Sequence, residues 1–208
     1  MRIFLIGASG MVGSRILTEA LSRGHEVIAA ARTPAKIATG PGVTPVQADL
    51  ANPAGIADLA RGADVIVSAT SPRSTGDAIA ESHQFGHALL ALARDTGLRL
   101  FVVGGAGSLK LPDGSAVLDT LPDLYRAEAT GFRDVRDMLK ASSIDWTFFS
   151  PAGLIAPGDR TGTFRLGTDH LVIDAEGNSR ISAEDYAVAV LDELEAPAHK
   201  GQQFTIGY

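Results

Sequence analysis

Three glycines near the start of the chain restrict the fold more than any other feature of the sequence. They stand at positions 7, 10 and 13, directly after an apolar run over residues 3–6. A continuous apolar run is typical of a parallel strand that is covered on both faces. Because glycine has no β-carbon, this spacing permits a tight turn, a close approach of backbone to a ligand and close packing of the next helix. The stretch therefore predicts a strand that turns sharply into a helix.

The beginning of that helix is a predicted phosphate site. Apolar side chains recur at helical spacing over residues 11–21, the pattern stops at Gly24, and a second apolar strand is expected over residues 25–31. The first N–H groups of a helix lack partners and lie at the positive end of its dipole, where a pyrophosphate can bind. The spacing G-x-x-G-x-x-G is one residue longer than the dinucleotide fingerprint G-x-G-x-x-G, and a glycine turn used only for packing is the alternative. The predicted cofactor contacts in this turn are Gly7, Ala8, Ser9, Gly10, Met11, Val12 and Gly13.

The residue after the second strand indicates which dinucleotide binds. In NAD-binding proteins an Asp or Glu about 20 residues beyond the glycines usually accepts a hydrogen bond from the ribose 2′-hydroxyl. This sequence has Arg32 in that region, with Thr33 and Lys36 close behind. A guanidinium matches a 2′-phosphate, so Arg32 predicts NADP as the cofactor, with NADPH preferred over NADH. A side chain that only extends into solvent is the alternative.

The ends of later strands supply the remaining cofactor contacts, because ligands of doubly wound sheets collect at the carboxyl ends of the strands. Strands are expected over residues 43–48, 63–69, 98–103 and 144–149. Asp49 and Leu50 are predicted to hold the adenine, although Asp49 could instead cap a short helix over residues 53–60. The predicted contacts at the other strand ends are Ala69, Thr70, Ser71, Gly104 and Pro151.

Ser108 is the candidate catalytic residue at the end of the fifth strand. Glycines at positions 104, 105 and 107 are expected to let the backbone pass close to something flat, and Ser108 is the first side chain beyond them that can form a hydrogen bond. In the expected sheet order this end of the strand lies near the nicotinamide half of the cofactor. A hydroxyl there can stabilise charge that develops in the transition state. The alternative is that Ser108 caps the irregular segment that follows it.

Strands and helices alternate through the sequence. This alternation predicts an α/β fold with a doubly wound Rossmann parallel sheet, ordered about 3-2-1-4-5-6, in a single domain over residues 1–208. Long helices are expected over residues 76–96 and 123–141, and a third begins at an N-cap on Ser182. An excursion at about residues 150–181 contains short possible strands at 163–166 and 171–173, and it is expected to build the substrate side.

Composition excludes several classes of protein. The chain has no cysteine, which excludes disulfides, thiolate metal sites and cysteine nucleophiles. Its net charge of -6 argues against a nucleic-acid partner. No apolar run reaches the roughly 20 residues of a membrane span and no signal peptide is expected, so we expect a cytoplasmic protein without a membrane partner. His83 and His87 share a helix face but have no third ligand nearby, and no metal site is predicted. The oligomeric state, monomer or homodimer, stays open.

Several motifs together resemble the atypical branch of the short-chain dehydrogenase/reductase superfamily. In chain order they are GASGMVG at 7–13, Asp49-Leu50, VVGGAGS at 102–108, DWT at 145–147 before Ser150-Pro151, and ISAEDYA at 181–187. The resemblance covers nearly the whole chain. It is greatest to proteins named NADH-flavin reductases, which are relatives of biliverdin reductase B and of the NmrA-like redox sensors. The resemblance implies a Rossmann sheet of about seven strands that binds NAD(P), with a serine near the nicotinamide at the position of Ser108.

The sequence departs from that superfamily at its usual catalytic pair. Ordinary members use Tyr-x-x-x-Lys, in which the lysine lowers the tyrosine pKa and holds the nicotinamide ribose. Here Tyr125 is followed four residues later by Ala129, so Tyr125 is a catalytic candidate without its usual activation.

The missing lysine also bears on the reaction. Reducing a ketone requires an acid, whereas a flavin, quinone or bilin delocalises the charge that it gains with a hydride. The sequence therefore predicts an NAD(P)H-dependent oxidoreductase that reduces a small conjugated acceptor by direct hydride transfer. The alternatives are a redox sensor without activity, as in the NmrA-like group, and then a sugar-nucleotide epimerase or dehydratase.

Overall fold

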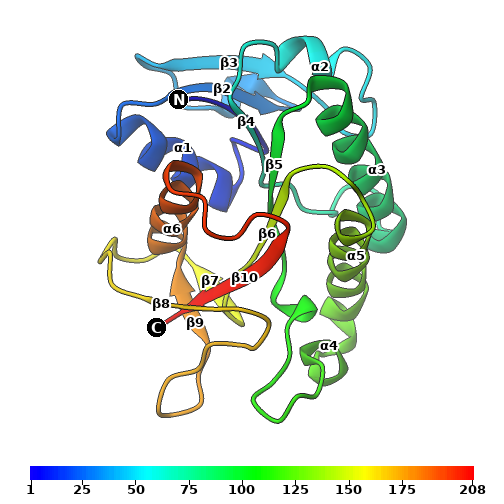
Figure 1. The fold of residues 1–208 in the computed structure, drawn as a ribbon, viewed down its shortest axis with the longest axis vertical. Helices are drawn as coiled ribbons and strands as arrows, with labels where there is room; N and C mark the ends of the chain where they lie inside the picture. The colour runs from blue at the N-terminus through cyan, green and yellow to red at the C-terminus, as the bar shows by residue number, and fades with distance from the viewer.

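An eight-stranded sheet runs through the middle of the computed structural model, which describes all 208 residues (Figure 1). The strand order is β3-β2-β1-β4-β5-β6-β10-β8, and β8 alone runs antiparallel to its neighbour. The predicted order 3-2-1-4-5-6 is thus confirmed and extended by two strands at one edge. The strands are β1 (Arg2–Ile6), β2 (Glu26–Ala31), β3 (Val43–Gln47), β4 (Val65–Ser68), β5 (Arg99–Val103), β6 (Trp146–Ser150), β8 (Arg165–Gly167) and β10 (Gln202–Gly207).

Helices cover both faces of this sheet, as a doubly wound fold requires. On one face α1 (Met11–Ser22) packs beside α6 (Ala183–Glu195), and on the other α3 (Ala78–Thr96) packs beside α5 (Asp123–Lys140). Each helix pair closes its own apolar core against the sheet. The predicted single-domain α/β Rossmann fold is therefore confirmed. Shorter helices are η1 (Pro34–Lys36), α2 (Ile56–Leu59), η2 (Ala106–Ser108) and α4 (Val117–Thr120).

Local signals in the sequence set the ends of the long helices. The Asp77 side chain accepts a hydrogen bond from the N–H of Ala80 and begins α3, which ends at Gly97 with φ +70°. The Ser182 hydroxyl accepts from the N–H of Asp185, 2.9 Å away, so the predicted N-cap of α6 is confirmed. None of the helices is both long and apolar enough to span a membrane.

The excursion after β6 differs from the sequence prediction. A strand forms at Arg165–Gly167, but residues 171–173 are not a strand. A separate two-stranded parallel sheet pairs β7 (Leu154–Ala156) with β9 (Arg180–Ser182), and the sequence did not predict it. Strands of three residues carry too little periodicity to be recognised, and they form here because long-range partners hold them.

Asp185 fastens this excursion to α6. Its carboxylate is completely buried and accepts hydrogen bonds from the N–H groups of Thr161 and Gly162, both at 2.8 Å. The hydroxyls of Thr161 and Tyr208 donate to the same carboxylate at 2.6 and 2.7 Å. Segments that follow β6 and β10 thereby meet at the first turn of one helix.

Candidate functional site

The turn between β1 and α1 has no room for a side chain at two of its glycines. A β-carbon on Gly7 would lie 2.4 Å from the carbonyl oxygen of Ala69, and Gly7 also has a φ of +86°. A β-carbon on Gly13 would lie 2.1 Å from the carbonyl oxygen of Gly7, whereas one on Gly10 would lie 3.3 Å from that oxygen. Both short contacts involve backbone that cannot rotate away. Glycine is therefore required at positions 7 and 13.

The N-terminus of α1 is open to a ligand at this turn. Its N-cap is Gly10, no side chain caps it, and its first turn has no acidic residue. The unpaired N–H groups and the positive end of the helix dipole suit an anionic group. Backbone without side chains at the glycine turn, next to a helix N-terminus without an acidic residue, fits the pyrophosphate of a dinucleotide.

A cleft of about 250 Å³ opens beside the turn, where β1, β2, β3 and β4 end. Arg32 lines it from the end of β2, and Asp49 and Leu50 line it from the end of β3. The structure brings together most of the cofactor contacts predicted from the sequence. Those that line the cleft are Gly7, Ser9, Gly10, Arg32, Asp49, Leu50, Ala69, Thr70 and Ser71.

Sequence reasoning missed part of this lining. Arg73 and Ser74 line the cleft from the loop between β4 and α3, and Phe85 lines it from α3 itself. The polar stretch over residues 71–77, directly after a buried strand, is the signal that could have identified the loop. The sequence could not show that this loop folds back toward the end of β2.

The two arginines of the cleft differ in their partners. Arg73 forms a two-pronged ion pair with Glu128 of α5, at 3.0 and 3.1 Å. The guanidinium of Arg32 is exposed, forms no ion pair, and donates to the hydroxyl of Ser74. Arg32 therefore supplies the cleft with a guanidinium that is not held in an ion pair.

Asp49 has a local partner, but it is not the helix cap that the sequence allowed. Its Oδ1 accepts a hydrogen bond from the N–H of Ala51, 3.0 Å away. The short helix α2 begins at Ile56 after an N-cap on Gly55. The alternative in which Asp49 caps this helix is thus wrong, because the helix starts too far along the chain.

Ser108 lies in a buried hydrogen-bond network and not on the cleft lining. Its Oγ is 2.8 Å from the carbonyl oxygen of Gly105, 2.9 Å from Oγ of Ser150 and 3.0 Å from Nε2 of Gln203. The amide of Gln203 is oriented by Arg136, which donates to its Oε1. A hydroxyl offers one donor and two acceptor positions, and these three contacts fill them. Ser108 could donate to a substrate only after its bond to Gly105 breaks.

Tyr125 has no activating partner. Its side chain lies on the first turn of α5 and is 54% exposed. At the position of the usual lysine, Ala129 is buried, and its β-carbon would be 2.5 Å from a β-carbon on Gly107. The helix therefore packs directly on η2 at the position where the pattern Tyr-x-x-x-Lys would have its lysine.

The other predicted contacts lie off the cleft lining. A β-carbon on Gly104 would lie 2.2 Å from the ring of Phe148, so the flat group beside this glycine is a core side chain. Pro151 is buried after β6. In the glycine turn Ala8 is buried in the core, whereas Met11 is 41% exposed. Val12 and Gly13 belong to the first turn of α1.

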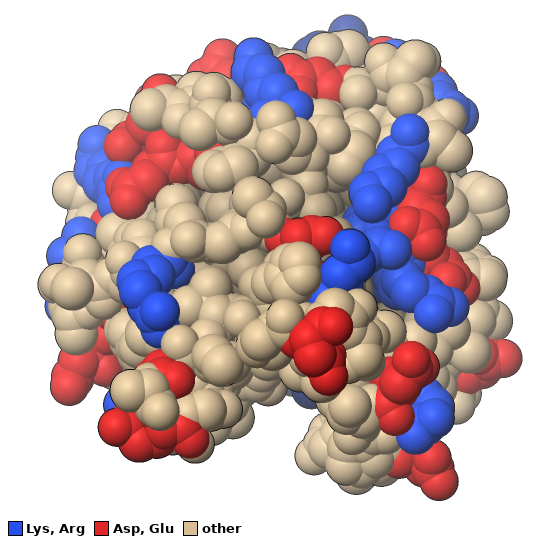
Figure 2. All heavy atoms as spheres, turned by 60° about the horizontal axis from the view of Figure 1, so that its bottom comes forward, with Lys and Arg blue, Asp and Glu red and all other residues tan.

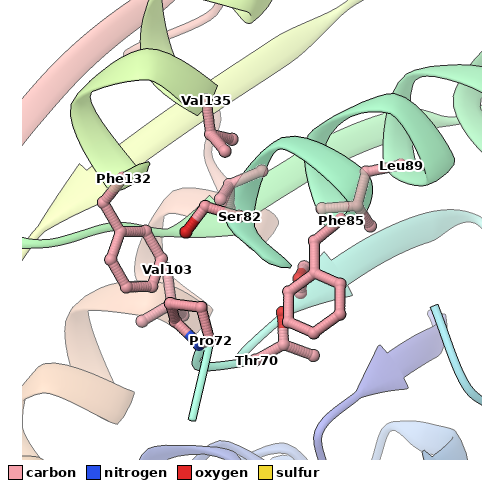
Figure 3. Close-up of a pocket in the computed structure, with 10 residues that line it drawn as sticks. Thr70, Pro72, Ser82, Phe85, Leu89, Val103, Phe132 and Val135 are labelled. Atoms are coloured by element: carbon pink, nitrogen blue, oxygen red, sulfur yellow. The ribbon is translucent and has the colours of Figure 1, made fainter. Parts of the chain in front are cut away.

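A small apolar pocket adjoins the cleft between α3 and α5 (Figure 3). Thr70 and Phe85 line both the pocket and the cleft, and the ring of Phe132 lies on the opposite side of the pocket from that of Phe85. The hydroxyl of Ser82 is buried there and makes no hydrogen bond. Apolar surface thus extends from the cleft into this small pocket at the ends of β4 and β5.

The titratable side chains outside the cleft do not group into a metal site. His83 pairs with Asp134 at 2.9 Å, and no three His, Asp or Glu side chains are grouped to hold a metal. Figure 2, in which the bottom of Figure 1 comes forward, shows several basic side chains gathered on the right of this face with acidic side chains beside them. The glycine turn and its cleft are therefore the strongest candidate for a functional site.

Comparison with known proteins agrees with this assignment. Residues 7–197 match the protein family described as NAD(P)H-binding. The uncharacterized protein YwnB of Bacillus subtilis is 39% identical over 99% of this chain and 98% of its own. A Burkholderia pseudomallei structure, provisionally named an exported protein, is 44% identical with a TM-score of 0.89, and the match covers 100% of both chains.

Two further solved structures carry enzyme names. One, provisionally named an epimerase, comes from Bacteroides thetaiotaomicron; it is 39% identical over 100% of this chain and 96% of its own, with a TM-score of 0.92. The other, provisionally named an NADH-flavin reductase, comes from Streptococcus pneumoniae; it is 30% identical over 100% of this chain and 99% of its own, with a TM-score of 0.88.

Proposed function

Because this chain belongs to the NAD(P)H-binding family, we propose that it is an NADPH-dependent reductase of a small conjugated acceptor such as a flavin, a quinone or a bilin. The provisional name of the Streptococcus pneumoniae relative supports a flavin as acceptor. The observation that carries the proposal is the packing of Ala129 against Gly107, which leaves Tyr125 without the lysine that would activate it.

The residues of the cleft fit the cofactor. The turn over residues 7–13 and the open end of α1 would hold the pyrophosphate, and Asp49 and Leu50 would flank the adenine. Arg32, with its unpaired charge, would bind the ribose 2′-phosphate and favour NADPH over NADH. When bound, the reduced nicotinamide supplies the hydride.

The choice of acceptor follows from what the site lacks. A ketone that accepts a hydride becomes an alkoxide and needs a positioned acid, often worth about 10²- to 10⁴-fold in rate. Ser108 is saturated by its own partners and Tyr125 faces solvent, so neither is ready to act as that acid. A conjugated acceptor spreads the charge over its rings and can take its proton from water. Phe85, which lines the cleft from α3, offers an aromatic face to a flat ring system of this kind.

A turnover panel tests the proposal. The purified protein is mixed with NADPH and the loss of reduced nicotinamide absorbance is followed with riboflavin, menadione, biliverdin and a simple ketone. We expect turnover with at least one conjugated acceptor and none with the ketone. Equal rates with the ketone would contradict the argument from the missing acid. NADPH binding without turnover of any acceptor would favour the sensor instead.

A further inference from the structure

The loop between β4 and α3 is fixed by a buried carboxylate. Glu81 lies in the first turn of α3 and is 3% exposed. Its Oε2 accepts hydrogen bonds from the N–H groups of Ser74 and Thr75, at 2.9 and 3.2 Å. No cation pairs with Glu81, so the loop N–H groups and the helix dipole stabilise its charge.

The charge on Glu81 is maintained in spite of its burial. Burial opposes ionisation, but the hydrogen bonds from Ser74 and Thr75 outweigh it and lower the pKa of the carboxyl below its ordinary value. Glu81 is therefore an anion at neutral pH. As an anion it accepts both loop N–H groups and holds the Ser74 backbone against α3.

From this fixed backbone the Ser74 side chain reaches across the cleft. Its Oγ accepts a hydrogen bond from Nη1 of Arg32, which comes from the end of β2, 42 positions earlier in the sequence. The Ser74 hydroxyl also forms a hydrogen bond to the Glu81 carboxylate and helps to lower its pKa, so a bound phosphate would compete with Glu81 for this O–H. Both Ser74 and Arg32 line the cleft, and the guanidinium keeps further N–H groups free for a ligand.

The nearby acid does not compete for these donors. Asp49 also lines the cleft, but it forms no ion pair with Arg32, and its Oδ1 is engaged by the N–H of Ala51. A guanidinium that forms no ion pair, beside a hydroxyl that can turn to a ligand, suits a phosphate monoester, whose several oxygens can accept from both at once.

We propose that Ser74 is a second ligand of the ribose 2′-phosphate beside Arg32, and that Glu81 is the residue that positions it. The inference rests on the proposed use of NADPH and adds a specificity determinant from a different part of the chain. In the bound state the Ser74 hydroxyl donates to a phosphate oxygen and Arg32 donates to its neighbours. Loss of the Ser74 hydroxyl then weakens the binding of ligands that carry a 2′-phosphate and leaves the binding of ligands without one unchanged.

Two nucleotide fragments test the proposal without any turnover. Calorimetry with the full chain gives the dissociation constants of adenosine 2′,5′-bisphosphate and of adenosine 5′-monophosphate, which differ only in the 2′-phosphate. For Ser74→Ala we expect binding of the bisphosphate to weaken about 10-fold, the loss of one hydrogen bond to a charged group, with the monophosphate unchanged. Ser74→Thr keeps the hydroxyl at this exposed position and should restore binding of the bisphosphate.

A second variant addresses the positioning residue. Residue 81 does not line the cleft, so Glu81→Gln changes no ligand contact, but it removes the charge that holds the loop. Like Ser74→Ala, it should weaken binding of the bisphosphate relative to the monophosphate. If this variant does not fold, the Ser74 pair still decides the question. Equal weakening of both fragments by Ser74→Ala would mean that Ser74 only closes the loop, and no weakening would mean that it binds nothing; either result overturns the inference.

Arg32→Ala separates this inference from the proposed function. Suppose that the Arg32→Ala variant loses the preference for the bisphosphate over the monophosphate while the Ser74→Ala variant retains the wild-type preference. In that case the NADPH assignment stands and the Ser74 assignment fails. If the wild-type chain binds both fragments equally, the use of NADPH and the Ser74 assignment fail together.

Discussion

The glycine turn allows one prediction whose size follows from the structure. In Gly13→Ala the new β-carbon would stand 2.1 Å from the carbonyl oxygen of Gly7, with the carbonyl carbon at 2.8 Å and Cα of Ala8 at 3.2 Å. All three atoms are backbone, so no side chain can rotate to relieve the contact. The distance has to grow from 2.1 Å to at least 3.0 Å, so the turn and α1 separate by about 0.9 Å.

This displacement damages phosphate binding more than folding. Overpacking of this kind costs about 1–3 kcal/mol of stability. A hydrogen bond near 2.9 Å that lengthens by about 0.9 Å passes the limit of roughly 3.5 Å for a useful contact. Each charged hydrogen bond contributes about 1.5–3 kcal/mol, so losing two weakens NADPH binding by about 100-fold or more.

Nicotinamide fluorescence measures the dissociation constant of NADPH, and urea denaturation measures stability. Two control variants test whether the loss of NADPH binding follows the closeness of the added β-carbon to other atoms. Gly40→Ala meets no heavy atom within 4 Å and should match the wild type, whereas Gly10→Ala, at 3.3 Å from the same oxygen, should be intermediate. A folded Gly13→Ala variant that binds NADPH as tightly as the wild type would refute the reasoning that this turn holds the pyrophosphate.

Four further predictions concern the cleft, the hydrogen-bond network and the excursion. Arg32→Ala should weaken NADPH binding by about 10- to 100-fold and leave NADH binding unchanged, as measured by fluorescence titration of each cofactor. If both cofactors lose the same affinity, Arg32 does not contact the 2′-phosphate. Ser108→Ala should lower the thermal midpoint and keep kcat, because it costs about 1–3 kcal/mol through unsatisfied partners such as Gln203. A folded variant whose kcat falls about 10- to 1000-fold would instead support a catalytic role for Ser108. Asp185→Ala removes a buried acceptor of four hydrogen bonds and should cost on the order of 3–5 kcal/mol in urea denaturation; a loss below about 1 kcal/mol would contradict the assigned role. Glu193 is a buried residue of α6 whose carboxylate accepts hydrogen bonds from Arg99, Ala198 and His199. Burial opposes ionisation of Asp185 and Glu193, but hydrogen bonds lower the pKa of both carboxyls in the folded state, so the stability that they contribute is present above about pH 4.5 and is lost as pH falls through their folded pKa values. A urea midpoint that stays constant as the pH is lowered through this range would contradict this account.

Much of this molecule could be predicted from local sequence. Alternating apolar strands and amphipathic helices indicated the doubly wound sheet, because burial on both faces requires continuous apolar strands. The ends of helices could also be predicted from local sequence. Ser182 and Gly24 mark the beginning and the end of their helices because a capping hydroxyl or a left-handed residue acts within one turn of the chain. The glycine spacing likewise identified the turn beside the cleft.

The tertiary structure decided which polar groups are free to act. Ser108 was the obvious hydroxyl at the end of β5, yet Ser150 and Gln203 come from other strands and occupy its acceptor positions. Ser74 gave no signal of its own, and its hydroxyl meets Arg32 in a loop whose backbone is hydrogen-bonded to Glu81 of α3. Sequence patterns report interactions over a few residues. Whether a donor is free or already bonded depends on side chains that the fold brings together from distant parts of the chain, and a single sequence contains no signal for those contacts.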